Sequence, residues 1–167
     1  MVKHLFLFLP IVVMLSSTVY SQEKEKLVEF YDVKYDTTAD PFKDLQTAVA
    51  VAQKTDRNIL LDVGGEWCIW CHRLDSLFRD NKDLAEYLKE NYVPLKINFS
   101  KANKNEKFLS QFPEIPGYPH LFVLDSNGKL IHSQDTGQLE EGKKHSKAKV
   151  FAFLRQWSPK KDEMKGN

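Results

Sequence analysis

The sequence predicts an α/β fold in which a central mixed β-sheet is flanked by helices, and three patterns support this prediction. Residues 58–63 form an apolar run broken only by Asp62, which is typical of a strand buried on both faces. Residues 93–99 alternate between apolar and polar side chains, as a second strand does. Asn127-Gly128 is a tight-turn signal between two further strands, which should be antiparallel neighbours. A helical crossover between the first two strands makes that unit β-α-β with parallel strands, so the sheet combines parallel pairing there with antiparallel pairing in the hairpin.

The other elements follow from local signals in chain order. Leu27–Tyr35 alternates well enough for a short first strand or an extended arm. Asp40-Pro41 starts a helix, because the carboxylate can cap free N–H groups and proline suits the first helical position. Both Cys68 and Cys71 fall in the first turn of the helix that follows the strand at 58–63. Further helices are expected at about 82–90, at about 104–112 and after a Ser146 cap, and further strands at 120–124 and 129–133.

The N-terminus has the layout of a secretory signal peptide, with a short basic start, an apolar run at 5–15 and small polar residues after it. Cleavage is expected after Ser21, which predicts an exported protein, periplasmic or secreted. A retained membrane anchor is the alternative, although the apolar run is short for a membrane span. The chain then divides into a signal peptide (1–21), an N-terminal extension (22–39), a single domain (40–158) and a polar tail (159–167).

Charge and cysteine content narrow the class of function. The chain has 24 Lys and Arg against 23 Asp and Glu, and residues 1–21 contain one Lys, so the mature chain has 23 of each. A neutral balance argues against a nucleic-acid partner. The chain has only two cysteines, and the Cys68–Cys71 pair closes almost no loop. A disulfide of that kind stabilises a fold poorly, so redox chemistry is the better explanation of the pair.

The position of the pair assigns different tasks to the two thiols. The nucleophile in disulfide exchange is a thiolate, and unpaired N–H groups at a helix N-terminus favour the anion. Cys68 should therefore attack a partner disulfide. Cys71 lies one turn further into the helix and should resolve the mixed disulfide.

The order of strand, Cys-x-x-Cys helix, crossover and proline-introduced hairpin resembles the thioredoxin family from about Phe42 to Trp157. Asp62 stands where thioredoxins carry a buried carboxylate, Trp67 precedes the first cysteine, and Lys96 matches a lysine often found near that carboxylate. Tyr118-Pro119 matches the dipeptide that contains the cis-proline of the family. The resemblance implies a thioredoxin-like fold for 40–158 and a thiol-disulfide oxidoreductase activity.

The cysteine motif departs from that of typical thioredoxins. Ile69-Trp70 replaces Gly-Pro between the cysteines, and His72 replaces a common lysine. The Trp-Cys-x-Trp-Cys form looks like that of exported bacterial thioredoxin-like proteins. Because the intervening dipeptide tunes the reduction potential, the direction of electron flow stays open, with reductase or electron-relay duty slightly favoured over oxidase duty.

The resemblance also implies roles for the surrounding residues. Asp62, if buried, accepts the proton that Cys71 loses, because burial raises the pKa of a carboxyl toward neutrality. Trp67, Trp70, Tyr118 and Pro119 are the expected substrate contacts, and His72 and Lys96 are expected to modulate the site, although each could be a packing or solvent-facing residue. No cofactor or metal is expected. The expected partners are exported proteins or peptides with thiols or disulfides and a membrane electron donor, and we expect a monomer.

Three other functions stay open. Cys68 to His72 also fits the Cys-x-x-Cys-His pattern of covalent c-type haem, but Met164 in the tail is the only methionine of the mature chain, so a second histidine would have to be the axial ligand. Two thiolates with His72 or His120 would suit copper(I) or zinc in a soft-metal carrier. The last alternative is a redox-inactive partner-binding domain.

Overall fold

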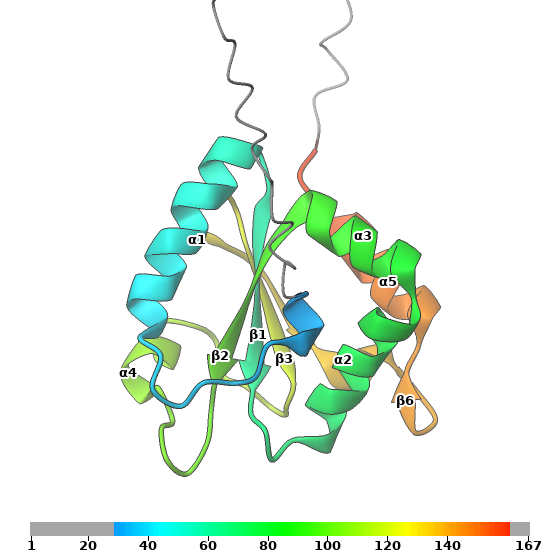
Figure 1. Cartoon of the computed structure of the whole chain (residues 1–167), viewed down its shortest axis with the longest axis horizontal. Coiled ribbons are helices and arrows are strands. Elements are labelled where there is room, and N and C mark those ends of the chain that lie inside the picture. The colour runs from blue at the N-terminus through cyan, green and yellow to red at the C-terminus, as the bar shows by residue number, and fades with distance from the viewer. Residues whose placement is uncertain (1–28, 161–167) are drawn as a thin grey trace, which may run out of the picture.

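The computed structural model describes residues 29–160, and Figure 1 traces the fold from the N-terminal arm to the closing helix. The expected signal peptide, the first part of the N-terminal extension, Met164 and most of the polar tail lie outside the described residues. Within 29–160, no helix is both long enough and apolar enough to cross a membrane.

The centre of the fold is a four-stranded mixed sheet in the order β2-β1-β3-β4. β1 and β2 are parallel, and β1 pairs with β3, and β3 with β4, in antiparallel fashion. This confirms the predicted β-α-β unit followed by a hairpin. The strands are β1 (Asn58–Gly64), β2 (Tyr92–Asn98), β3 (His120–Leu124) and β4 (Leu130–Asp135).

Helices cover both faces of this sheet. α1 and α4 lie on one side, and α2, α3 and α5 lie on the other (Figure 1). Asp40 caps α1 as predicted, since its side chain accepts hydrogen bonds from the N–H groups of Phe42 and Lys43. The helices are α1 (Pro41–Thr55), α2 (Ile69–Asp80), α3 (Lys82–Asn91), α4 (Glu106–Leu109) and α5 (Lys147–Trp157).

The alternation of side chains along β1 decides which residue lies beneath the cysteine helix. Ile59, Leu61 and Val63 pack on the α1 and α4 side, whereas Leu60 packs on the side of α2, α3 and α5. Successive side chains of a strand point to opposite faces, so Asp62 lies on the same side as Leu60, under α2. All seven residues of β1 are buried, as the apolar run predicted.

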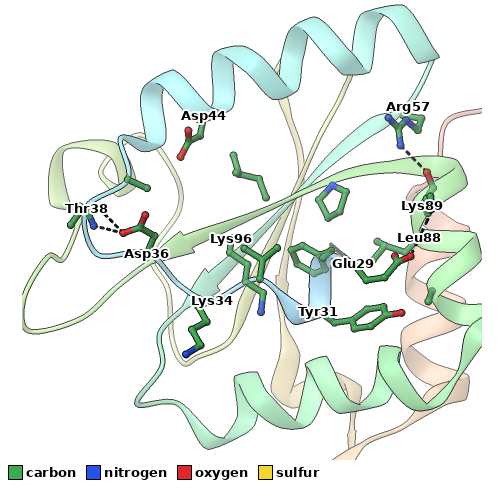
Figure 2. Close-up of a pocket in the computed structure, with 16 residues that line it drawn as sticks. Glu29, Tyr31, Lys34, Asp36, Thr38, Asp44, Arg57, Leu88, Lys89 and Lys96 are labelled. Atoms are coloured by element: carbon green, nitrogen blue, oxygen red, sulfur yellow. Dashed lines mark hydrogen bonds and ion pairs between the residues drawn. The ribbon is translucent and has the colours of Figure 1, made fainter. Parts of the chain in front are cut away.

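Residues 29–39 form an arm that is not part of the sheet, so of the two predictions for Leu27–Tyr35 the first strand is wrong for the described part and the arm agrees with the structure. A 3-10 turn, η1 (Phe30–Asp32), satisfies its backbone groups locally instead. β2 therefore stays an edge strand, which suits Pro94 because proline cannot donate to a neighbouring strand. A cavity of about 660 Å³ lies between the arm and β2, and its lining includes Tyr31, Pro94 and Lys96 (Figure 2).

Three smaller differences have local causes. The helix predicted at 104–112 shortens to α4, because Asn105 takes a left-handed conformation at φ 49° and the chain continues as turns after Leu109. Ser146 stands at the N-cap of α5, but its side chain makes no capping hydrogen bond. A 3-10 turn, η2 (Thr136–Leu139), and a hairpin of β5 (Glu140–Glu141) and β6 (Lys144–His145) were not predicted, because two-residue strands carry no readable periodicity.

Candidate functional site

The two cysteines form a disulfide where β1 leads into α2. Cys68 is the N-cap residue, and its Sγ accepts a hydrogen bond from the backbone N–H of Cys71 at 3.1 Å. Cys68 is 3% exposed and Cys71 is fully buried. Cys68 is thus the more exposed of the two residues, and at the N-cap it is next to the free N–H groups of the helix.

Glycines before the motif allow the backbone to approach the disulfide closely. A Cβ on Gly64 would lie 2.5 Å from Cys71 Sγ, and one on Gly65 would lie 2.5 Å from Trp67 Nε1. Neither position has room for a side chain unless a neighbour moves. β1 therefore ends at Gly64, and the absence of side chains at Gly64 and Gly65 lets the backbone lie close to Cys71 and Trp67.

Aromatic side chains form one wall beside the disulfide. Trp67 is 58% exposed, and its indole N–H donates to the Phe99 carbonyl at 2.7 Å. Tyr118 stacks on Phe99 with ring centroids 4.7 Å apart and meets the Trp67 ring edge-on at 5.6 Å. The Tyr118–Pro119 bond is cis, as the resemblance implied. The structure thus brings Trp67 and Tyr118 together beside the pair, and Pro119 is buried next to them.

Trp70 has a more enclosed place than Trp67. It packs against the cysteine pair, and its ring meets His145 edge-on at 5.5 Å and lies 4.4 Å from the Arg73 guanidinium carbon. Ile69, in contrast, is 59% exposed directly beside Cys68, and it was not among the expected substrate contacts. Ile69 therefore joins Trp67 as an apolar surface at the mouth of the site.

Asp62 is a fully buried carboxylate beneath the cysteine helix. Neither of its oxygens has a hydrogen-bond partner among the described residues. Burial raises the pKa of Asp62 to about 7, and the Lys96 ammonium opposes part of that rise. A carboxyl with a pKa near neutrality can both accept and return a proton at physiological pH.

Lys96 lies beside Asp62 across the β1–β2 pair, but its direct partner is another carboxylate. The register places Asp62 opposite Lys96, yet the Lys96 ammonium binds Asp75 Oδ2 at 2.7 Å. The Lys96 and Asp75 side chains are only 3% and 8% exposed. Asp75 was not among the predicted site residues, because one helical turn after Cys71 a carboxylate looks like a solvated helix residue until β2 places Lys96 beside it.

The sequence profile of the thioredoxin-like family matches residues 40–126. The chain belongs to the thioredoxin-like family. Its fold is similar to that of a disulphide isomerase from Xylella fastidiosa Temecula1, with a TM-score of 0.64 and 25% identity over 73% of this chain and 94% of that one. The comparison with curated proteins gave no match.

Two further solved structures share the fold at lower identity. The C-terminal domain of Neisseria meningitidis DsbD in the oxidised form has a TM-score of 0.55 and 15% identity, over 75% of this chain and 99% of that domain. DsbH oxidoreductase has a TM-score of 0.52 and 17% identity, over 74% of this chain and 83% of its own.

The thioredoxin-like match covers most of the site but not all of it. Asp62, the two cysteines, Asp75, Lys96 and the Tyr118–Pro119 pair lie inside residues 40–126. Tyr35 and His145 lie outside the match, yet both are buried against the cysteine motif, Tyr35 at the sulfurs and His145 at Trp70. Burial lowers the pKa of His145 to about 4, so its ring is neutral at pH 7.

The histidines that the alternative readings needed have other partners. The His72 ring makes a hydrogen bond with the Glu66 carbonyl at 2.9 Å, and the His120 ring makes one with Ser133 Oγ at 2.9 Å. Among residues 29–160, no three His, Cys, Asp or Glu side chains are grouped as metal ligands would be. Neither the soft-metal nor the haem reading therefore gains an observation in its favour.

Proposed function

We propose that this thioredoxin-like protein is a thiol-disulfide oxidoreductase that exchanges disulfides with exported proteins, as a reductase or electron relay rather than an oxidase. The observation that carries the proposal is the Cys68–Cys71 disulfide at the start of α2, above a buried carboxylate that has no hydrogen-bond partner within residues 29–160. The similarity in fold to a disulphide isomerase supports the same class of chemistry.

Cys68 attacks first in the reducing direction. At the N-cap its sulfur lies among the free N–H groups of the helix, and the Cys71 N–H already points to it. The Cys68 thiolate attacks one sulfur of a substrate disulfide, that S–S bond breaks, and the second substrate sulfur leaves with the electron pair. The product is a mixed disulfide between Cys68 and the substrate.

Cys71 then resolves the mixed disulfide. Its thiol proton passes to the Asp62 carboxylate, and the Cys71 sulfur attacks Cys68 Sγ. The Cys68–substrate bond breaks, the substrate leaves as a thiolate that takes up a proton, and the Cys68–Cys71 disulfide is restored. The substrate gains two electrons and the protein dithiol loses two. A pKa near 7 suits Asp62 to this step. At neutral pH part of the protein carries the ionised carboxylate, which can accept the proton, and the protonated form readily loses it again to solvent.

The substrate face is the aromatic wall beside the disulfide. Trp67 and Ile69 are the exposed apolar residues next to Cys68, and a cavity of about 630 Å³ continues from Trp67 past Phe99 to Lys104. We assign substrate contact to Trp67, Trp70 and the cis Tyr118–Pro119 segment, whose backbone can pair with an extended peptide. His72 fixes the loop before the pair through Glu66.

Export and regeneration complete the proposal. Removal of residues 1–21 would release the mature chain outside the cytoplasm, where disulfide-bonded substrates occur. A reductase there needs a source of electrons, and a membrane dithiol donor is the class of partner that fits.

Trapping tests the proposal. Cys71→Ser should accumulate covalent adducts between Cys68 and substrate proteins in the native compartment, and these should be released by dithiothreitol. Cys68→Ser is the matched control and should form none and lose exchange with a disulfide-bonded test substrate. Undiminished exchange by Cys68→Ser would contradict the proposal. The measured reduction potential, compared with that of the compartment, settles the direction of electron flow.

A further inference from the structure

The N-terminal arm is fixed at two points, the far end of α2 and the loop before Cys68. The Arg79 guanidinium, from α2, donates to the Tyr31 carbonyl at 3.0 Å and to Asp32 Oδ1 at 3.1 Å. Further along, the backbone N–H of Tyr35 donates to Glu66 Oε1 at 2.9 Å, in the loop that leads to Cys68. These contacts hold Tyr35 in place, although the arm is not part of the sheet.

The Tyr35 side chain lies directly against the disulfide. Tyr35 is 3% exposed and packs in one cluster with Cys68 and Cys71. The Tyr35 hydroxyl oxygen and Cys71 Sγ lie 3.0 and 2.5 Å from the single point where a Gly64 Cβ would sit. The Lys96 ammonium lies 4.7 Å from the centre of the Tyr35 ring. The phenol hydroxyl therefore lies near the resolving sulfur, and its ring lies beside the buried Lys96 ammonium.

The Tyr35 hydroxyl is buried, and it makes no hydrogen bond with any described residue while the cysteines form a disulfide. A buried polar group without a partner costs free energy, which a second function of the group would explain. Asp62 and Gly64 stand two residues apart on β1 and face the same side of the sheet, so the Asp62 carboxylate lies beside the space that Tyr35 and Cys71 share. Burial raises the pKa of both groups; the Asp62 charge adds to the rise at Tyr35, and the phenol opposes part of the rise at Asp62.

Burial is the largest cause that raises the pKa of Tyr35 well above 10, and the charges of Asp62, Asp75 and Glu66 add to it. The phenol is therefore neutral and can donate one hydrogen bond while it accepts another. The Lys96 ammonium is the cation beside the Tyr35 ring, and it is bound to Asp75 Oδ2.

We propose that Tyr35 relays the proton from Cys71 to Asp62 in the resolving step. The proposal rests on the proposed function. As the Cys71 S–H bond breaks, the proton goes to the Tyr35 oxygen, and the phenol passes its own proton to the Asp62 carboxylate. Cys71 becomes the attacking thiolate, Asp62 becomes neutral, and Tyr35 ends with the proton count it began with. The arm thereby completes a relay whose other members, Cys71 and Asp62, lie within the thioredoxin-like match.

Tyr35→Phe tests the relay, because it removes one oxygen and keeps the ring that packs on Gly64 and Lys96. Tyr31→Phe, in the same arm, is the matched control. The readout is single-turnover resolution of a Cys68 mixed disulfide as a function of pH. We expect Tyr35→Phe to slow resolution roughly tenfold or more at pH 7, since a positioned proton-transfer group contributes at least that much. We also expect the pH midpoint to move upward, because Asp62 loses the phenol that lowers its pKa.

A measurement on the unmodified protein tests the same proposal without a variant. Resolution in H₂O–D₂O mixtures should depend on the deuterium fraction with curvature, because two protons move together in a relay. A linear dependence, or a Tyr35→Phe variant with the rate and pH midpoint of the control, would overturn the relay. If Tyr31→Phe slowed resolution as much as Tyr35→Phe, the effect would belong to the arm and the relay would be wrong. Cys68→Ser tests the proposed function separately. If that variant loses exchange while Tyr35→Phe resolves at the control rate, the relay is wrong and the proposed function stands.

Discussion

Replacing Asp62 by asparagine should stabilise the folded protein, and the gain should depend on pH. Burial raises the pKa of Asp62 from 3.8 to about 7. Each pKa unit corresponds to about 1.4 kcal/mol of difference between the protonation states, so this carboxylate costs the folded state about 4 kcal/mol when it is ionised. Asparagine has the same shape and cannot ionise.

The sign of the effect follows from the direction of the pKa change. The protonated carboxyl is the favoured form in the folded chain, so below about pH 4 the ionisation of Asp62 costs little stability. Stability falls as the pH rises from the unfolded pKa to the folded pKa near 7, and above it the whole cost is present. The advantage of Asp62→Asn should therefore be small near pH 4 and about 4 kcal/mol near pH 9.

Urea unfolding of the disulfide form measures this difference without a contribution from the cysteines. The free energies of unfolding of the variant and the unmodified protein are compared near pH 4 and near pH 9. Asp80→Asn, at an exposed carboxylate at the end of α2, controls for loss of one negative charge. An advantage of Asp62→Asn that is the same at both pH values would refute the assignment of a destabilising, buried carboxylate.

Three other changes have outcomes that the structure specifies. Lys96→Met should lower the free energy of unfolding by roughly 3 kcal/mol near pH 8, because it strands the buried Asp75 charge, and adding Asp75→Asn should recover most of the loss in the same urea assay. Gly64→Ala should cost about 1–3 kcal/mol in thermal unfolding, because its Cβ would lie 2.5 Å from Cys71 Sγ; an unchanged Tm would mean that the sulfur moves freely. Asp40→Ala should cost about 1 kcal/mol through loss of the α1 cap, with no change in reduction potential.

The strands and the hairpin could be predicted because periodic patterns and a turn signal in the sequence mark them. The buried run at 58–63, the alternation at 93–99 and the Asn-Gly turn each correspond to an observed strand or hairpin. The placement of Asp62 also follows from such a pattern, because a residue between Leu61 and Val63 must share a face with Leu60.

The parts of the site that could not be predicted depend on contacts between distant segments. The alternation at Leu27–Tyr35 predicts only a strand or an extended arm, and it is the path of that arm past α2 that brings the Tyr35 ring to the cysteines. Asp75 looks like a solvated helix residue until β2 places Lys96 beside it. His145 reaches Trp70 through a hairpin too short to leave a signal in the sequence. The tertiary fold decides each of these three contacts, and the local sequence around each residue carries no signal for it.

The proposed role of Asp62 is chemical rather than stabilising, and one substitution can separate the two. At pH 8 an ionised Asp62 costs the fold about 4 kcal/mol, so a residue chosen for stability alone would be neutral. Asp62→Asn should therefore be more stable than the unmodified protein and, because it cannot accept the Cys71 proton, should resolve mixed disulfides on the order of a hundredfold more slowly at that pH. Measured on one preparation, opposite changes in stability and rate identify a carboxylate retained for proton transfer. A variant that gained stability and kept the full rate would place the base elsewhere, and the relay from Tyr35 would then lack its acceptor.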